Sequence, residues 1–597
     1  MTSPGFRWGV PGGGPQGQYR SQKWLRGDDE VALANRVALT SAGVPAGGGG
    51  PVIGIANSAS QLNPCNLPLR RLAGAVAEGV RAAGGAPAEF PTISLGEDLM
   101  KPSAMLYRNL LAIEVEEMVR ANPLDGLVVL ANCDKSVPGA LMGAISANVP
   151  TVLVTGGARP RAMFRGRALG AGTDLWRMWD ERRAGRLDDA GWQELEEALG
   201  QGCGACNTMG TASTMAVLAE ALGLMVPGAA SIPAGDPRGL EAAARAGRVA
   251  VEAVRASLND GASQETRGGR RPQDIVTPVA VRNAIRVLHA VGGSTNAIIH
   301  LAAMAGRAGA AYPLDDIARL GADVPVLADV EPSGAGLMQD FDAGGGVPAL
   351  LRELGERLDT GARTVTGQTI GEIAAAAPPP SGAIRTADRP LRSGGAFAVV
   401  RGSLAPDGAV IKVSAASPEL LTHRGPAVVF RDYDDMRRRV ADPDLPVTPD
   451  SVLVMAGCGP SAGMPEWGMV PIPAALVAAG VTDMVRVTDS RMSGTSFGTV
   501  VLHVAPEAAA GGPLALVQDG DMIALDAAAG TLELEVAPEE LARRAAAWSP
   551  PPPAHLRGWP ALYARTVQQA PQGCDLDFLT APSPEHRKFI EPVVGRS

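Results

Sequence analysis

Three short apolar runs, each followed by a polar loop, constrain the fold of this chain most strongly. Residues 51–56 (PVIGIA), 125–131 (DGLVVLA) and 149–155 (VPTVLVT) have the length and β-branched content of buried strands. Residues 69–84 and 104–121, which lie between the first two runs, carry apolar residues at helical spacing. Strands that alternate with helices in this way predict a parallel sheet with helices on both faces.

The loops that follow these runs hold unusual polar residues. ASQLNPC follows the first run, and NCDKS follows the second, so that Cys133, Asp134 and Lys135 stand side by side where a core strand ends. Ligands usually bind at the carboxyl ends of the strands of a parallel sheet. The sequence therefore predicts a functional site at this edge of the sheet.

The 597-residue chain is too long for one core, and its pattern changes near residue 380. Helical patterns dominate up to about residue 375, and residues 374–390, with an alanine run and three prolines, are the best candidate for a linker. We predict an α/β chain with a disordered leader (1–19), an N-terminal α/β/α domain with a parallel sheet (20–380), and a C-terminal domain (381–597). The C-terminal domain is expected to be β-rich, barrel-like and of the swivel type, with a helical tail from residue 541. Its expected strands are residues 396–404, 408–414, 426–432, 451–457, 483–489 and 498–504.

Bulk properties exclude several classes of function. The formal charge of −9 argues against a nucleic-acid partner, which needs a basic face, and an aromatic content of 4% argues against base stacking. No apolar run of 18 residues is present, so we expect no membrane span, and the N-terminus lacks the apolar region of a signal peptide. The six cysteines are too few for a disulfide scaffold of this size, so we expect a cytoplasmic, reduced protein.

Three of the thiols, Cys65, Cys133 and Cys206, lie in polar loops. A single free cysteine is most often a small buried hydrophobic residue, but three in loops after strands suggest ligands. Cys203 and Cys206 form a CxxC, which is half of a zinc site or a redox pair, although no second pair follows at zinc-finger spacing. Thiolates alternatively favour an iron–sulfur cluster, in which three ligands leave one iron position open.

A set of hard ligands accompanies the thiols. Glu97, Asp134 and Glu466 lie in glycine-containing loops, and carboxylates in such loops suit Mg²⁺, although any one of them alone is most simply a solvated acid. Lys135 is an odd neighbour for a cation site because an ammonium cannot bind a metal ion. It would become a ligand if it were carbamylated.

Four long motifs carry a resemblance to a known family. CDKSVPGALMGA, CNTMGTASTMAVLAEALG, GGSTNAIIHL and TDSRMSGTSFG resemble the signatures of the dihydroxy-acid and sugar-acid dehydratases (the IlvD/Edd family), and the resemblance extends from about residue 20 to residue 579. The wording of LMKPSAMLYRNL and RMSGTSFGTVVLH is most similar to the sugar-acid branch, of which arabinonate dehydratases are the type. The resemblance implies a homodimer or homotetramer.

The resemblance also implies a role for each candidate residue. The implied iron–sulfur ligands are Cys65, Cys133 and Cys206. The implied Mg²⁺ ligands are Glu97, Asp134, Lys135 as its carbamate, and Glu466. Ser493 is the implied base, and Thr495 beside it is an implied substrate contact. The sugar-acid branch favours a [2Fe–2S] over a [4Fe–4S] cluster, and the remaining cysteines do not match ligand positions.

The implied reaction removes water from a 2,3-dihydroxy sugar acid, such as an aldonate, and yields the 2-keto-3-deoxy acid. Ser493 would take the C2 proton, and since it belongs to the β-rich domain we expect the site to lie between the domains. One alternative is the dihydroxy-acid dehydratase of branched-chain amino-acid synthesis, which needs an apolar pocket for the substrate tail. A second alternative is a noncatalytic iron–sulfur redox sensor, with Cys203 and Cys206 as its switch.

The chain departs from the family pattern in three places. Pro68 stands where the family commonly has a histidine, and the loop 457–466 is two residues shorter than the sugar-acid pattern, which bears on the placement of Glu466. The segment GGARPRAMFRG adds Arg159 and Arg161 near the expected pocket mouth. These arginines are either ordinary surface charges or aids to an anionic substrate.

Overall fold

A computed structural model of the chain describes residues 19–45, 49–258, 269–552 and 554–580. The predicted leader therefore lies almost wholly outside the described residues. The N-terminal part of the chain is built on a parallel sheet with the strand order β2-β1-β3-β4. Its strands are β1 (Val52–Asn57), β2 (Ala86–Pro91), β3 (Gly126–Leu130) and β4 (Thr151–Val154).

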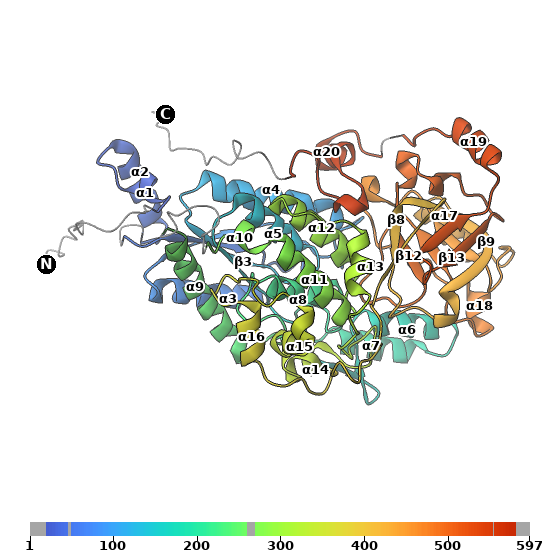
Figure 1. The fold of residues 1–597 in the computed structure, drawn as a ribbon, viewed down its shortest axis with the longest axis horizontal. Coiled ribbons are helices and arrows are strands. Elements are labelled where there is room, and N and C mark those ends of the chain that lie inside the picture. The colour runs from blue at the N-terminus through green and yellow to red at the C-terminus, as the bar shows by residue number, and fades with distance from the viewer. Residues whose placement is uncertain (1–18, 46–48, 259–268, 553, 581–597) are drawn as a thin grey trace.

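Helices cover both faces of this sheet, as the strand–helix pattern predicted (Figure 1). Helices α3 (Leu69–Ala82) and α9 (Pro237–Leu258) pack together on one face, and α4 (Met105–Ala121) and α5 (Ser136–Ala147) pack together on the other. Small residues allow these close contacts: a Cβ on Gly79 would lie 1.9 Å from the carbonyl oxygen of Ala244.

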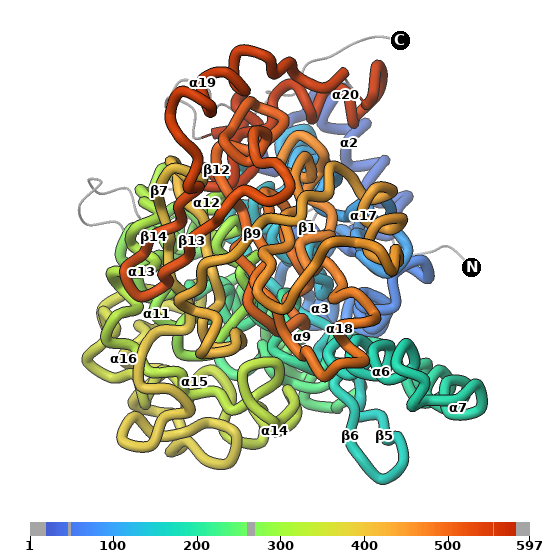
Figure 2. The backbone as a smooth tube through the Cα atoms, turned by 90° about the vertical axis from the view of Figure 1, so that its right-hand side faces the viewer, coloured from blue at the N-terminus to red at the C-terminus, as the bar shows by residue number. Residues whose placement is uncertain are grey.

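Further helices complete the N-terminal body, and most of them pack around one continuous apolar core, whereas α7 (Asp189–Leu199) packs with a small hairpin in a cluster of its own. They are α1 (Gln22–Leu25), α2 (Glu30–Ser41), α6 (Thr173–Arg183), α7 (Asp189–Leu199), α8 (Thr211–Ala221), α10 (Pro272–Ile275), α11 (Pro278–Ala290), α12 (Asn296–Ala308), α13 (Asp315–Gly321), α14 (Met338–Ala343), α15 (Gly346–Leu354) and α16 (Ile370–Ala376). Figure 2 shows α6, α7 and the small hairpin β5 (Ala162–Phe164) and β6 (Arg167–Leu169) projecting from the body.

The C-terminal part forms a closed barrel, which confirms the predicted α/β chain with a barrel-like second unit. The strand order is β10-β11-β12-β8-β7-β14-β13-β9, with its own apolar interior. The strands are β7 (Ala398–Gly402), β8 (Ala405–Ile411), β9 (Thr422–Phe430), β10 (Val452–Met455), β11 (Arg486–Thr488), β12 (Val500–Ala505), β13 (Met522–Asp526) and β14 (Thr531–Leu534). The associated helices are α17 (Tyr433–Arg439), α18 (Ala474–Ala478), α19 (Pro538–Ala547) and α20 (Gly558–Thr566).

The outer face of the barrel packs on the N-terminal body. Along β8, Ala409 and Ile411 point into the barrel core, whereas Val410 belongs to the core of the N-terminal body together with Val500 and Leu502 of β12. Alternate residues of a strand face opposite sides, so one strand serves two cores. The loops at the ends of β11 and β12 are thereby held against the helices of the body.

The C-terminal segment fastens the barrel side to the N-terminal body. Asp575 accepts two hydrogen bonds from the buried guanidinium of Arg307, at 2.8 and 2.9 Å, and Trp559 Nε1 donates to the carbonyl of Leu106 at 2.7 Å. The predicted linker also packs on the body, since Ile384 forms a β-bridge with Ala328, and Arg392, just after the linker, forms one with Val326. A domain boundary near residue 380 stays a prediction.

One strand of the sheet was not predicted. β2 contains Pro87 and Pro91, which weaken a strand signal, but it lies at the edge of the sheet, where a missing N–H is tolerated. The pair β13 and β14 was also not predicted. Among the described residues, no helix combines the length and the apolarity that crossing a bilayer requires.

Candidate active site

Two of the predicted thiol ligands meet in the crevice between β1 and β3. Cys65 lies in the loop after β1 and Cys133 follows β3, at the point where the strand order reverses. Asn66 Oδ1 accepts from the backbone N–H of Asn132 and of Cys133, at 3.1 and 2.9 Å. Asn132 Nδ2 in turn donates to the carbonyl of Cys65 at 2.7 Å. These bonds fix the two cysteine loops to each other.

Cys206 completes the thiol group. Contact with the Cys65 thiol, followed by burial, raises the pKa of Cys133 well above its usual value, and nearby Cys206 adds to the rise. Burial, followed by the proximity of Cys65, likewise raises the pKa of Cys206, while Arg159 opposes this. The three thiols therefore lie so close together that a negative charge on one of them disfavours ionisation of the others. The structure brings together the residues that the sequence nominated, and their role as ligands stays a prediction.

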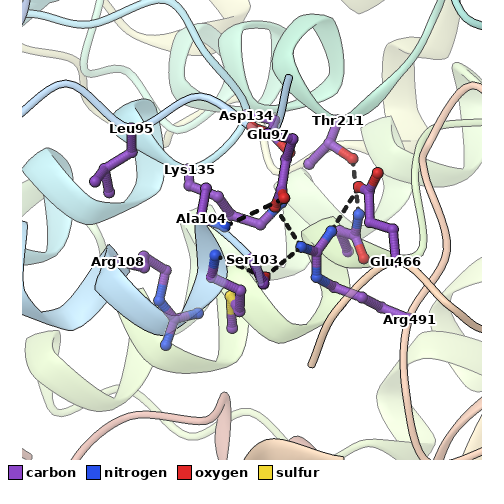
Figure 3. A network of polar contacts seen from close by, with 12 residues as sticks. Leu95, Glu97, Ser103, Ala104, Arg108, Asp134, Lys135, Thr211, Glu466 and Arg491 are labelled. Carbon is purple, nitrogen blue, oxygen red and sulfur yellow. Dashed lines mark hydrogen bonds and ion pairs between the residues drawn. The ribbon is translucent and has the colours of Figure 1, made fainter. Parts of the chain in front are cut away.

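The predicted hard ligands also converge, although they come from distant parts of the chain. Carboxylate oxygens of Glu97, Asp134 and Glu466 lie within 4.8 Å of one another, so the shortened loop before Glu466 still places this residue at the site (Figure 3). Lys135 Nζ lies 2.5 Å from Asp134 Oδ2 and 3.5 Å from Glu97 Oε1. All four residues nominated for Mg²⁺ are thus in one place.

Arg491 holds this carboxylate group together, although it was not predicted as a site residue from the sequence. Its guanidinium donates to Glu466 Oε1 at 2.6 Å, to Ser103 Oγ at 2.9 Å and to Glu97 (Figure 3). The sequence signal that could have identified it is an arginine in a glycine- and serine-containing loop directly after a buried strand. An arginine that is buried at such a position requires acidic partners. It lies two residues before Ser493, so it ties the loop of the predicted base to the carboxylates.

The charges of the site reflect these contacts. Burial raises the pKa of Glu466 to about 7, and Arg491 limits the rise. Burial also disfavours the charged form of Asp134, but the ammonium of Lys135 and the guanidinium of Arg491 outweigh it, and the pKa of Asp134 lies below its ordinary value. Three carboxylates in one small volume need positive charge, which two side-chain cations supply here.

Ser493 and Thr495 lie in the loop between β11 and β12, which reaches onto the N-terminal body. Ser493 Oγ lies 2.9 Å from Thr495 Oγ1, and Thr173 Oγ1 donates to the carbonyl of Thr495 at 2.8 Å. Gly494 approaches α8 so closely that a Cβ there would lie 2.6 Å from the backbone nitrogen of Thr211. The predicted base is thus at the junction of the two parts of the chain, as expected.

Three helices begin against this loop. Thr173 and Thr211 open α6 and α8, and Asn296, which opens α12, donates through Nδ2 to the carbonyl of Met492 at 3.2 Å. The amino ends of helices carry partial positive charge, which favours negative charge on a neighbouring group. Ser493 is partly exposed, whereas its neighbours Gly494 and Thr495 are buried.

The other cysteines occupy different surroundings. Cys203 lines a mainly apolar cavity of ≈ 280 Å³ at the carboxyl end of β4, together with Pro68. Cys458 and Cys574 are buried in apolar clusters. Among the added arginines near the pocket, Arg161 pairs with Asp340 at 2.6 Å on the surface.

The donor sets fit the groups that the resemblance implies. Clustered thiols with raised pKa values become thiolates readily only beside a metal, and three thiolates suit iron rather than Mg²⁺. The oxygen set of Glu97, Asp134 and Glu466 suits a hard cation such as Mg²⁺.

Comparison with known proteins agrees with this arrangement. Family models for the N-terminal and C-terminal parts of the dihydroxy-acid/6-phosphogluconate dehydratases match residues 50–373 and 382–574. The fold and site therefore define a dehydratase, which is a hydro-lyase. The chain belongs to the dihydroxy-acid/6-phosphogluconate dehydratase family.

Relatives within the family act on different acids. The chain is 47% identical to 6-deoxy-6-sulfo-D-gluconate dehydratase of Pseudomonas putida over 572 residues, which cover 94% of this chain and 97% of that protein. It is 45% identical to L-arabinonate dehydratase of Rhizobium leguminosarum bv. trifolii (strain WSM2304), with coverage of 94% and 96%. It is 39% identical to a dihydroxy-acid dehydratase of Chloroflexus aggregans (strain MD-66 / DSM 9485), with coverage of 88% and 93%.

Proposed function

We propose that this chain is a sugar-acid dehydratase that converts an aldonate into the 2-keto-3-deoxy acid with loss of water. The observation that carries the proposal is the convergence of three groups of residues. The thiols, the carboxylates and the Ser493 loop meet at one place, and Arg491 joins the last two through its bond to Glu466. The relatives named for sugar acids have higher identities than the dihydroxy-acid dehydratase compared above.

We assign the cofactors by the chemistry of the donors. Cys65, Cys133 and Cys206 would hold a [2Fe–2S] cluster, with [4Fe–4S] as the alternative, and Glu97, Asp134, Glu466 and carbamylated Lys135 would hold Mg²⁺. When bound, the two centres supply Lewis acidity at the leaving C3 hydroxyl and stabilisation of the negative charge that develops near C1 and C2.

The protein's own residues then handle the proton. Ser493 Oγ, as the alkoxide, takes the proton from C2, and the electron pair forms the C2–C3 double bond. The C3 hydroxyl leaves as hydroxide, which takes the proton back from Ser493 Oγ and becomes water. The resulting enol takes a proton at C3, loses the proton of its C2 hydroxyl and becomes the 2-keto acid. The Thr495 hydroxyl, 2.9 Å from Ser493 Oγ, would donate to the anionic serine and hold it in place, and the amino ends of α6, α8 and α12 would favour this anionic form.

A substrate panel tests the proposal. The full chain, purified without oxygen and supplied with Mg²⁺, is incubated with five- and six-carbon aldonates and with 2,3-dihydroxyisovalerate, and the 2-keto acid is measured. We expect a higher kcat/KM for at least one aldonate than for dihydroxyisovalerate. The reverse order would favour the branched-chain alternative, and no turnover of any acid would favour a redox sensor.

We also propose a homodimer or homotetramer that acts on a small hydroxy acid without nucleic-acid or membrane partners. Light scattering of the full chain gives the assembly state directly.

A further inference from the structure

A second group of polar residues lies beside the catalytic loop, which is the loop between β11 and β12 that carries Ser493. The proposed chemistry does not use this group. It consists of Thr208, Glu331 and Arg177, and we refer to it as the Thr208–Glu331 group. Thr208 follows Cys206 by two residues, and Glu331 belongs to the loop after α13. Arg177 lies on α6, whose first residue, Thr173, bonds the carbonyl of Thr495.

Distances place this group next to Thr495. A Cβ on Gly210 would lie 3.0 Å from Thr495 Cγ2 and 3.8 Å from Thr208 Oγ1. A Cβ on Gly170 would lie 2.3 Å from Glu331 Oε2 and 2.9 Å from Thr208 Cγ2. Thr208 is therefore close to Thr495 on one side and to Glu331 on the other. The backbone N–H of Met209 also donates to the carbonyl of Glu331 at 2.8 Å.

Two of these side chains are buried with a polar atom unused. Glu331 is 7% exposed, and its Oε1 accepts from Arg177 Nη1 at 3.0 Å, but Oε2 has no hydrogen-bond partner among the described residues. Thr208 is fully buried, and its hydroxyl likewise finds no partner in the described part of the chain. Buried polar atoms are almost always hydrogen-bonded, so each vacant one calls for a water or a ligand.

The location suggests which ligand this is. Cys206 marks the side of the site where the C3 hydroxyl leaves, and Ser493 marks C2. Thr208 lies in the same loop as Cys206, on the C3 side, and next to Thr495 of the Ser493 loop. The part of a substrate beyond C3 would therefore extend toward Thr208. In a sugar acid this part carries hydroxyls, whereas in a branched-chain dihydroxy acid it is alkyl.

We propose that Thr208 and Glu331 form the subsite for the hydroxyls beyond C3 of a polyhydroxylated acid, with Arg177 holding Glu331 in position. This inference rests on the proposed sugar-acid dehydratase function. Glu331 Oε2 would accept a hydrogen bond from one hydroxyl, and the Thr208 hydroxyl would exchange a hydrogen bond with the same or the next one.

The same residues would discriminate against the alkyl alternative. An alkyl tail would leave a buried carboxylate oxygen and a buried hydroxyl without partners, and a site built for hydroxyls rejects analogues that lack them strongly for this reason. Arg177 has a second carboxylate partner, Asp174 at 3.2 Å, and its guanidinium lies 5.2 Å from the ring centroid of Phe497 in the catalytic loop. These contacts hold Arg177, which anchors Glu331 through Oε1, while Oε2 has no hydrogen-bond partner among the residues that the structure describes.

The test compares two substrates in matched variants of the full, metal-loaded enzyme. The readout is the ratio of kcat/KM for arabinonate to kcat/KM for 2,3-dihydroxybutanoate, which lacks hydroxyls beyond C3. Glu331→Gln, which removes the charged partner, should lower this ratio roughly tenfold to a hundredfold, and Thr208→Val should also lower it. Thr208→Ser retains the hydroxyl and should retain the ratio. Glu181→Gln, on the exposed face of α6 with Arg186 as its partner, is the control and should behave as the wild type.

A binding measurement separates recognition from chemistry. In a Ser493→Ala background, calorimetry should show weaker arabinonate binding for Glu331→Gln and unchanged binding of dihydroxybutanoate. Ratios that stay at the wild-type value in both Glu331→Gln and Thr208→Val would overturn the inference and leave the sugar-acid function standing. Equal losses for both substrates would overturn it too, because they would indicate a structural role. A wild type that dehydrates dihydroxybutanoate but no aldonate would overturn the proposed function and the inference together.

Discussion

The thiol of Cys133 lies 3.4 Å from Oδ1 of Asp134, and Oδ2 of the same carboxylate lies 2.5 Å from Lys135 Nζ. Consecutive residues after β3 therefore reach both ligand groups of the site, one with sulfur and the other with oxygen. Because the helix α5 begins immediately afterwards, these positions are fixed by the end of a strand and the start of a helix. The two predicted metal centres are consequently neighbours.

Replacement of the clustered thiols should remove iron. Cys65→Ser, Cys133→Ser and Cys206→Ser are each expected to lose most of the iron and acid-labile sulfide of the anaerobically purified chain, because hydroxyls are poor ligands for iron. Cys203→Ser is the matched control, since Cys203 is three residues from Cys206 but lines the apolar cavity. Loss of iron in Cys203→Ser equal to that in Cys206→Ser would instead favour a site built on the CxxC pair.

Removal of Arg491 should make the chain depend on Mg²⁺ for stability. Arg491→Ala leaves Glu97 and Glu466 without their guanidinium, and breaking such a buried pair costs about 3–5 kcal/mol. We expect a lower Tm in EDTA and a larger rise in Tm on addition of Mg²⁺ than in the wild type, as measured by differential scanning fluorimetry. An equal Mg²⁺-induced rise in both proteins would show that Arg491 and the metal do not share these carboxylates.

Loss of the serine should affect the chemical step rather than binding. Ser493→Ala should lower kcat on the order of 10²–10⁴-fold, the usual contribution of a positioned base, with arabinonate still bound. Thr495→Val should have a smaller effect, because it removes only the hydroxyl 2.9 Å from Ser493 Oγ. Ser496→Ala, in the same loop, is the control. Stopped-flow rates and calorimetry measure the two effects, and full kcat in Ser493→Ala would assign the base elsewhere.

A buried lysine outside the site should make the stability of the chain rise with pH above neutral pH. Lys412 follows β8, and its amine has no hydrogen-bond partner within the described residues; burial lowers its pKa from 10.5 to about 7. Between pH 7 and 10.5 the unfolded chain binds a proton that the folded chain lacks, so wild-type stability should rise with pH across this window. Below pH 7 the penalty is complete.

Replacement of this lysine should remove the penalty. Lys412→Met should raise the free energy of unfolding on the order of a few kcal/mol at pH 7 and flatten the rise between pH 7 and 10.5. Urea unfolding at several pH values measures both effects. Arg389→Met, at a side chain that is 87% exposed, is the control. An undiminished slope in Lys412→Met would show that another group titrates in this window.

The strand-end positions of the cysteines could be predicted because apolar runs and polar loops are local patterns. The parallel sheet, the barrel and the grouping of Cys65 with Cys133 followed from these patterns together with the family motifs. The edge strand β2 was missed because prolines weaken its local signal while its place at the sheet edge tolerates them.

Arg491 and Glu331 were missed for a different reason. Each acts through partners that are far away in the sequence: Arg491 bonds Glu97, which is 394 residues away, and Glu331 bonds Arg177, which is 154 residues away. The Arg491 pairing depends on how the barrel docks on the N-terminal body, and the Glu331 pairing depends on how α6 packs against the loop after α13. No local period in the sequence encodes such packing. The loop before Glu466 differs in length from the family pattern, but this local difference does not move the side chain away, and the Glu466 carboxylate still lies at the site.

The claim that one hydroxy acid contacts both metal centres has a direct spectroscopic test. The reduced cluster of Ser493→Ala, which should bind substrate without turning it over, is recorded by electron paramagnetic resonance with and without arabinonate, in Mg²⁺ and in EDTA. We predict that arabinonate shifts the cluster spectrum in Mg²⁺ and that EDTA abolishes the shift, because binding requires both centres. A cluster spectrum that saturating arabinonate leaves unchanged in Mg²⁺ would contradict the claim.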